Sequence, residues 1–134
     1  FTSPEETAPM KVRACASLED AVLGATDPRM FPAPIDKAFN TLSNRVRLLR
    51  WGGDCYNYSL VAYGHMDLVV EAGNQPYDIL PLVPVIEAAG GIVTDWEGRP
   101  LRGGEDFARC RNRMIAAGDR RVHAQAIEIL SKAP

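Results

Sequence analysis

The fold of this chain is decided by residues 67–91, which read DLVVEAGNQPYDILPLVPVIEAAGG. The run Leu68-Val69-Val70 is short and continuously apolar, which is typical of a strand buried on both faces. After a polar turn, apolar residues recur at helical spacing over 78–89 and stop at Gly90-Gly91, so the pattern predicts a helix there. Pro81 falls in the first turn of that helix, where proline is tolerated, whereas Pro84 is expected to kink it.

On either side of this stretch, short apolar runs alternate with amphipathic segments. Expected strands lie at 21–25, 46–51, 66–72, 92–94 and 114–117, and expected helices at 35–42, 56–63 and 121–130. Residues 11–16 are predicted as a further, weakly alternating strand, 17–20 as a helix start capped by Ser17, and 99–112 as an arginine-rich loop. Strands that alternate with helices indicate one α/β domain, with no convincing internal boundary.

The composition excludes several classes of protein. The chain has 134 residues, of which 46% are apolar and 24% charged, as expected for one globular domain and not for a disordered or collagen-like chain. Its 15 Lys and Arg against 17 Asp and Glu do not indicate a nucleic-acid-binding surface. No apolar run approaches the roughly 20 residues that span a bilayer. Three cysteines without a CxxC pair suit a reducing compartment. We expect neither nucleic acid nor membrane as a partner.

A first candidate site is Gly52-Gly53-Asp54, at the junction between an expected strand and an expected helix. Two glycines allow the backbone to approach a ligand closely, and Asp54 adds a carboxylate at a helix-cap position. The alternative is a plain turn followed by a capping aspartate. Spacing alone favours that alternative, because Asp is among the preferred N-cap residues.

A second candidate site is the pair Glu71 and Asp78, at the end of the apolar strand and the start of the following helix. These two positions can meet at one rim of an α/β sheet, where ligands bind. Two carboxylates there could hold a hard cation such as Mg2+, which prefers oxygen ligands. The alternative is again a capping Asp78 beside a solvated Glu71.

Other polar residues carry weaker signals. His65 and His123 have no Cys or His partner at metal-ligand spacing, so surface or packing roles are expected for both. A basic set between residues 99 and 113 could bind phosphate, although a solvated face is the favoured interpretation. This set comprises Arg99, Arg102, Arg109, Arg111 and Arg113.

Four segments together carry a resemblance to a known family. They are GGDCY at 52–56, DLVVE at 67–71, the run from Pro76 to Gly91, and TDWEG at 94–98. In this order they resemble the C-terminal half of the inositol-monophosphatase superfamily, over about residues 11–132. Within that superfamily the sequence is most similar to the histidinol-phosphate phosphatases, which are Mg2+-dependent phosphomonoesterases of histidine biosynthesis.

The resemblance implies a fold and a set of site residues. The fold would be α/β, a mixed sheet flanked by helices, with residues 1–134 as the C-terminal domain of a larger layered sandwich. Asp78 matches the last metal ligand and also belongs to the substrate-binding set, while Glu71 matches a carboxylate that contacts the organic part of the substrate. Gly52, Gly53 and Asp54 match a substrate-contacting turn. Inositol phosphatases carry small neutral residues in that turn, so Asp54 here suits a cationic amine or imidazolium.

The other metal ligands of the superfamily lie in its N-terminal half, as a Glu and the two Asp of an Asp-Pro-Ile-Asp-Gly-Thr motif. This chain contains no such motif: Pro34-Ile35-Asp36-Lys37 lacks the leading Asp and the Gly-Thr, so Asp36 is not assigned to metal. One carboxylate ligand and one neighbour do not hold two Mg2+ ions in octahedral shells. The start at Phe1 suggests a fragment, a processed product or a trimmed chain. Because those ligands are missing, we expect the N-terminal metal-binding half to be absent and no catalytic residue to lie in this half.

Several alternatives stay open at this point. The protein could be a relative that acts on inositol phosphates or another small phosphomonoester, or a truncated, non-catalytic binding module. The resemblance implies a homodimer and a cytoplasmic setting, although a plastid enzyme stripped of its transit peptide would look the same.

We predict that the 134-residue chain alone shows no appreciable phosphatase activity, because it lacks most of the metal ligands that the family requires. Phosphate release by the purified chain, measured with and without Mg2+ on a panel of phosphomonoesters, checks this. Sustained Mg2+-dependent turnover would contradict it.

Overall fold

A computed structural model describes residues 8–134 and shows one five-stranded sheet. The strands are β1 (Val22–Ala25), β2 (Leu48–Trp51), β3 (Leu68–Ala72), β4 (Ile92–Asp95) and β5 (Arg113–Ala117), in the order β2-β1-β3-β5-β4. β1 is parallel to both β2 and β3, whereas β5 is antiparallel to both β3 and β4. The predicted mixed sheet is therefore confirmed, and the five strands lie close to the expected positions.

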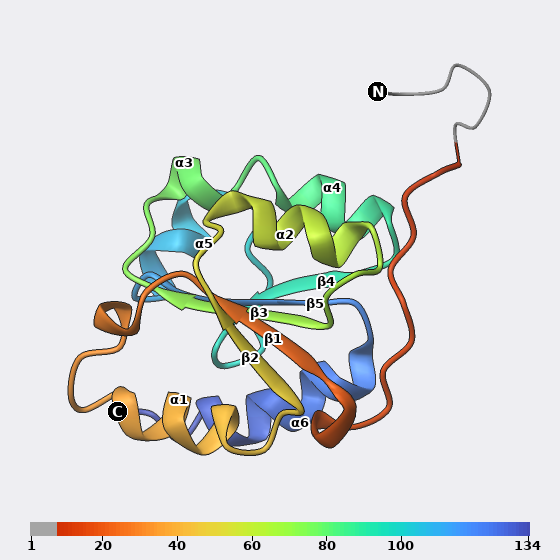
Figure 1. Ribbon diagram of the computed structural model, residues 1–134. Helices are drawn as coiled ribbons and strands as arrows, with labels where there is room; N and C mark the ends of the chain where they lie inside the picture. Colours follow the sequence, from red (N-terminus) through yellow and green to blue (C-terminus); the bar gives the residue numbers. More distant parts are fainter. Residues whose placement is uncertain (1–7) are drawn as a thin grey trace.

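Helices cover both faces of this sheet, as Figure 1 shows. They are α1 (Asp36–Ser43), α2 (Cys55–Ala62), α3 (Pro76–Ile79), α4 (Val83–Ala88), α5 (Gly104–Arg109) and α6 (Arg120–Leu130), with two single 3-10 turns, η1 (Leu18–Asp20) and η2 (Pro28–Met30). α1 packs against α6 on one face, and α2 packs against α4 on the other. None of the helices in residues 8–134 is both long and apolar enough to cross a membrane.

β3 lies in the middle of the sheet and is buried along its whole length. Its side chains alternate between two apolar clusters: Leu68 and Val70 belong to the cluster under α1 and α6, and Val69 to the cluster under α2 and α4. Glu71 follows Val69 by two residues, so strand alternation directs its carboxylate toward α2. The predicted strand buried on both faces is confirmed, and it sets the side of the sheet on which the candidate site lies.

The prediction of a strand at residues 11–16 is wrong. Instead of pairing with a strand, Arg13 forms a bidentate ion pair with the buried Asp67, with Nε–Oδ1 at 2.7 Å and Nη2–Oδ2 at 2.6 Å. Val12 donates its amide hydrogen to the carbonyl of Ala89, beyond the end of α4. The weak apolar alternation of residues 11–16 is misleading, because a long-range ion pair and a loop contact hold this segment in place. Neither contact leaves a local signal in the sequence.

The apolar segment 78–89 forms two short helices instead of one kinked helix. α3 ends at Ile79, and α4 begins at Val83 with Pro84 in its first turn. A proline at position 84 has no N–H to donate to the carbonyl of residue 80, and its ring clashes with that carbonyl. Pro84 does interrupt the helix, as predicted. The interruption lies about one turn before Pro84 in the chain and separates two helices instead of kinking one.

Two further predictions need correction. Residues 99–112, expected to be a loop, contain α5, which the burial of Phe107 and Cys110 anchors to the core under α2 and α4. Gly103 and Gly104 at its start disfavour this helix on propensity alone, so tertiary packing decides it. Ser17 precedes the single turn η1 but makes no capping bond; its hydroxyl contacts Asp20 Oδ2 at 3.2 Å instead.

His123 of α6 is buried, as the expected packing role requires, and its Nε2 lies 2.8 Å from Thr94 Oγ1 of β4. The Thr94 hydroxyl donates its one proton to the carbonyl of Asp95, so Nε2 carries the hydrogen in the His123–Thr94 bond. Burial, with a smaller contribution from the Arg120 charge, lowers the pKa of His123 to about 4. The folded protein therefore holds this ring neutral.

This neutral histidine predicts a pH-dependent stability. In the unfolded chain the pKa of His123 returns to about 6.5, so acid protonates the unfolded state first. We expect the free energy of unfolding to fall as the pH drops from about 6.5 to about 4, and His123→Gln to reduce that slope. Urea unfolding at a series of pH values measures it. His65→Gln, at an exposed position, is the matched control, and an equal change of slope in both variants would contradict the assignment.

Candidate functional site

A pocket of about 340 Å3 lies where β3 ends and α2 begins, and it is lined by all three carboxylates predicted from the sequence. Glu71 comes from β3, Asp54 immediately precedes α2, and Asp78 lies in α3. Asp54 and Asp78 are exposed at the rim, whereas Glu71 is only 3% exposed. The remaining lining residues are Cys55, Tyr58, Asn74, Tyr77 and Ile79. The pocket is therefore acidic, with one buried and two solvated carboxylates.

Glu71 is held by three side-chain donors. Thr26 Oγ1 donates to Oε1 at 2.5 Å, and Tyr58 Oη and Asn74 Nδ2 donate to Oε2 at 2.9 and 2.6 Å. The expectation of a solvated Glu71 is wrong, because the strand buries this residue. A buried carboxylate is tolerated only when hydrogen bonds replace its water, and these three donors do so.

The turn before α2 has an unusual backbone. Gly52, Gly53 and Asp54 have φ values of 88°, 111° and 45°. A Cβ at position 53 would lie 2.5 Å from Oδ1 of Asn57, whose Nδ2 bonds the Gly52 carbonyl at 2.9 Å, so glycine is required there by packing as well as by φ. Neither glycine lines the pocket; their predicted contact with substrate stays a prediction.

Asp54 stands at the N-cap position of α2, but its side chain makes no capping hydrogen bond. The alternative of a capping aspartate therefore does not explain this residue. A non-glycine residue with positive φ is uncommon and costs free energy, and such residues cluster at functional sites. The turn instead leaves the Asp54 carboxylate at the rim of the pocket.

Asp78 does cap a helix. Its Oδ2 accepts the backbone N–H of Gln75 at 2.8 Å, at the start of α3. Within the described part of the chain, Oδ1 of Asp78 accepts no hydrogen bond. The capping alternative and a ligand role are thus compatible, because a carboxylate has acceptor sites on both oxygens.

These residues fit a magnesium ion only in part. Over residues 8–134, no group of three His, Cys, Asp or Glu side chains is placed to hold a metal. Asp78 Oδ1 is an oxygen of the kind that Mg2+ accepts, whereas Glu71 is committed to three donors. The chain therefore offers one carboxylate toward a metal and not a complete coordination shell.

The sequence analysis missed three residues around the pocket: Thr26, Tyr58 and Asn74. Tyr58 follows Asp54 by four residues and so lies one helical turn further along the same face of α2, which is a signal that could have been used. Asn74 lies in the polar turn between Glu71 and Asp78. Thr26 follows β1 and comes close to Glu71 only through the parallel pairing of β1 with β3.

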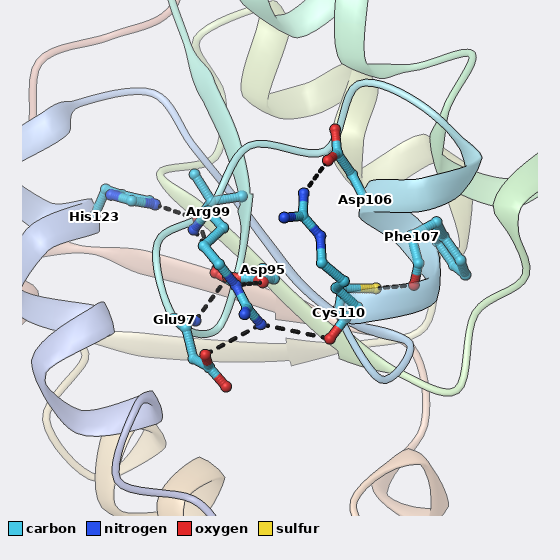
Figure 2. Close-up of polar contacts among 9 residues, drawn as sticks. Asp95, Glu97, Arg99, Asp106, Phe107, Cys110 and His123 are labelled. Carbon is cyan, nitrogen blue, oxygen red and sulfur yellow. Dashed lines mark hydrogen bonds and ion pairs between the residues drawn. The ribbon is translucent and has the colours of Figure 1, made fainter.

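The predicted basic set does not form a phosphate site at Arg99 or Arg109. Figure 2 shows the Arg99 guanidinium bound to both Asp95 and Glu97, with Nε–Oδ2 at 2.7 Å to Asp95. Arg109 pairs with Asp106. Arg113 stacks on Trp96, with its guanidinium carbon 5.6 Å from the ring centroid. Arg102, Arg109 and Arg111 are exposed, as the favoured interpretation of a solvated face expects, while Arg99, Arg109 and Arg113 also contact partners within the chain.

Asp36, which was not assigned to metal, lies in α1 on the face of the sheet opposite α2. It is not among the residues that line the pocket. The sheet separates this carboxylate from Glu71, so the partial motif around it makes no contribution to the candidate site.

The sequence model of the inositol monophosphatase family matches residues 5–134. The chain belongs to the inositol monophosphatase family. This confirms the family predicted from the four segments, while the histidinol-phosphate branch remains a prediction.

The names of curated relatives describe more than one phosphatase activity. A bifunctional chloroplastic phosphatase, IMPL2, of Arabidopsis thaliana is 41% identical over 123 residues, covering 90% of this chain and 36% of the relative. A histidinol-phosphatase of Chlorobaculum parvum is 30% identical, covering 79% and 42%. A probable inositol 1-monophosphatase, ImpA, of Mycobacterium tuberculosis is 31% identical, covering 97% and 52%.

Solved structures of the family share the fold. An inositol monophosphatase from Zymomonas mobilis aligns with a TM-score of 0.82 at 38% identity, over 91% of this chain and 46% of that one. An inositol monophosphatase from Anabaena aligns with a TM-score of 0.76 at 26% identity, over 94% and 49%. The chain thus spans about half the length of these proteins, and between 36% and 52% of the curated relatives.

Proposed function

We propose that this chain provides the substrate-recognition wall and one metal ligand of a Mg2+-dependent phosphatase that hydrolyses histidinol phosphate to histidinol and phosphate. The observation that carries the proposal is the acidic pocket lined by Asp54, Glu71 and Asp78. The Asp54 carboxylate has no hydrogen-bond or ion-pair partner among the described residues. A cationic amine or imidazolium would gain an ion pair as well as hydrogen bonds in such a pocket, whereas a neutral polyol would gain hydrogen bonds alone.

We propose one role for each carboxylate of the pocket. We assign Asp54 and Glu71 to the organic part of the substrate, with Gly52 and Gly53 shaping the turn that carries Asp54. We assign Asp78 to a metal through Oδ1, while Oδ2 continues to cap α3. The remaining metal ligands and the groups that act at phosphorus would come from residues outside this chain, and for that reason we propose that the chain alone is inactive.

The comparisons support this proposal in its general form. The family and the named relatives are phosphatases, and one relative is a histidinol-phosphatase. The relative from Mycobacterium tuberculosis and the structure from Zymomonas mobilis support the alternative, a phosphatase of inositol phosphates or another small phosphomonoester. A homodimer and a cytoplasmic setting are part of the proposal, and the chloroplastic name of the Arabidopsis relative keeps the plastid alternative open.

Asp78→Asn tests the metal ligand. The amide oxygen can still accept the N–H of Gln75, so the fold should keep its stability, while the loss of an anionic ligand should weaken Mg2+ binding and strongly depress turnover. Turnover of the complete protein is measured as a function of Mg2+ concentration. Asp119→Asn, at a capping aspartate of α6, is the matched control. Wild-type Mg2+ dependence in Asp78→Asn would leave Asp78 as a helix cap only.

Asp54→Asn tests the substrate. Its side chain makes no cap to lose, so the variant removes only the charge from the pocket rim. We expect a loss of about 1.5–3 kcal/mol in binding, the usual range for a hydrogen bond to a charged group, or roughly ten- to a hundredfold in kcat/KM for histidinol phosphate. Hydrolysis of a neutral polyol phosphate should change far less.

Both substrates are measured with the wild-type complete protein and with the Asp54→Asn variant. Glu87→Gln, an exposed carboxylate of α4 outside the pocket, should affect neither substrate. Equal losses on the two substrates would show that Asp54 supports the turn instead of the substrate, and would favour the inositol-phosphate alternative.

A further inference from the structure

Glu71 is held by donors from three separate parts of the chain. Thr26 follows β1, Tyr58 belongs to α2, and Asn74 lies in the loop between β3 and α3. The same α2 begins directly after Asp54, and the same loop leads into Asp78. The hydrogen bonds to Glu71 thus join the elements that carry the three carboxylates of the pocket.

Tyr58 is the most buried of these donors, with 1% of its side chain exposed. Burial, followed by the nearby charge of Glu71 and the hydrogen bond to it, raises the pKa of Tyr58 well above its usual value. The phenol therefore keeps its proton at all physiological pH values and donates it to Oε2. Its ring lies one helical turn from Asp54 and also lines the pocket.

The geometry also defines how many further hydrogen bonds Glu71 can accept. A carboxylate has about four acceptor sites, two on each oxygen. Tyr58 and Asn74 take both sites of Oε2, and Thr26 takes one site of Oε1. One acceptor site on Oε1 remains. Glu71 can therefore accept one further hydrogen bond, from a ligand, in a fixed orientation.

We infer that Tyr58 is a positioning residue of the site: its hydroxyl holds the Glu71 carboxylate in one orientation and locks α2, with Asp54, onto β3. This inference rests on the proposed function, since it assigns Tyr58 a role in the recognition of the substrate's organic part. Tyr58 itself does not act on the reacting atoms. It works through Glu71, and its contribution should disappear when Glu71 no longer carries a charge.

A double-mutant cycle tests this coupling in the complete protein. Tyr58→Phe keeps the buried ring and removes the hydroxyl, and Glu71→Gln removes the charge. We expect Tyr58→Phe to lower kcat/KM for histidinol phosphate by about tenfold, chiefly through KM, the scale of one hydrogen bond to a charged group. In the Glu71→Gln background, Tyr58→Phe should change kcat/KM by less than about twofold, because the residue it positions is already lost.

Two controls separate positioning from general stability. Tyr63→Phe removes an exposed hydroxyl just beyond the end of α2 and should leave kcat/KM unchanged. Thr26→Val removes the donor on Oε1 without altering α2, and its loss should likewise vanish in the Glu71→Gln background, so the test does not depend on one variant. Additive losses in both cycles would overturn the inference and leave the proposed function intact.

Failure of the proposed function gives a different result. If the wild-type protein hydrolyses another phosphomonoester but not histidinol phosphate, the proposed substrate is wrong, and the same cycles on the accepted ester decide the role of Tyr58. If the complete protein hydrolyses no phosphomonoester, the proposed function and the positioning role are both overturned.

Discussion

β3 is buried on both faces and pairs on both sides, with β1 and with β5, and most of the molecule depends on this constraint. Alternating side chains of β3 contribute to both apolar clusters, so the helices on the two faces pack against a common strand. The same alternation places Glu71 toward α2, at the point where the strand ends. An ionised side chain is thereby forced into a buried layer, and the surrounding structure has to satisfy it.

The hydrogen bonds to Glu71 show how the fold meets that requirement. A buried carboxylate without partners would cost several kcal/mol, so donors from the end of β1, from α2 and from the β3–α3 loop converge on it. Because each donor belongs to a different element, satisfying one charge also sets the relative positions of Asp54 and Asp78. Burial of Glu71 and assembly of the acidic pocket therefore have the same physical cause.

Other polar groups of the chain are satisfied in ways that make them structural. Asp67 is buried and bound by Arg13, and Asp95 is buried and bound by Arg99. In the sequence, Asp67 and Asp95 look like candidate site residues, because each is a charge beside an apolar run. In the structure, an arginine of the same chain pairs with each carboxylate. Asp54 differs because it is exposed in a turn with positive φ and has no such partner among residues 8–134.

The sequence by itself determined the α/β class, the approximate positions of the five strands that form and the family, because apolar periodicity and the four motif segments are local in the chain. It also identified Asp54, Glu71 and Asp78, which the structure brings to one pocket. Only the tertiary structure decided that α5 forms, that residues 11–16 are bound by an ion pair and not in the sheet, and that Thr26, Tyr58 and Asn74 surround Glu71. These features depend on contacts between residues as far as 54 positions apart, and such contacts leave no periodic signal in the sequence.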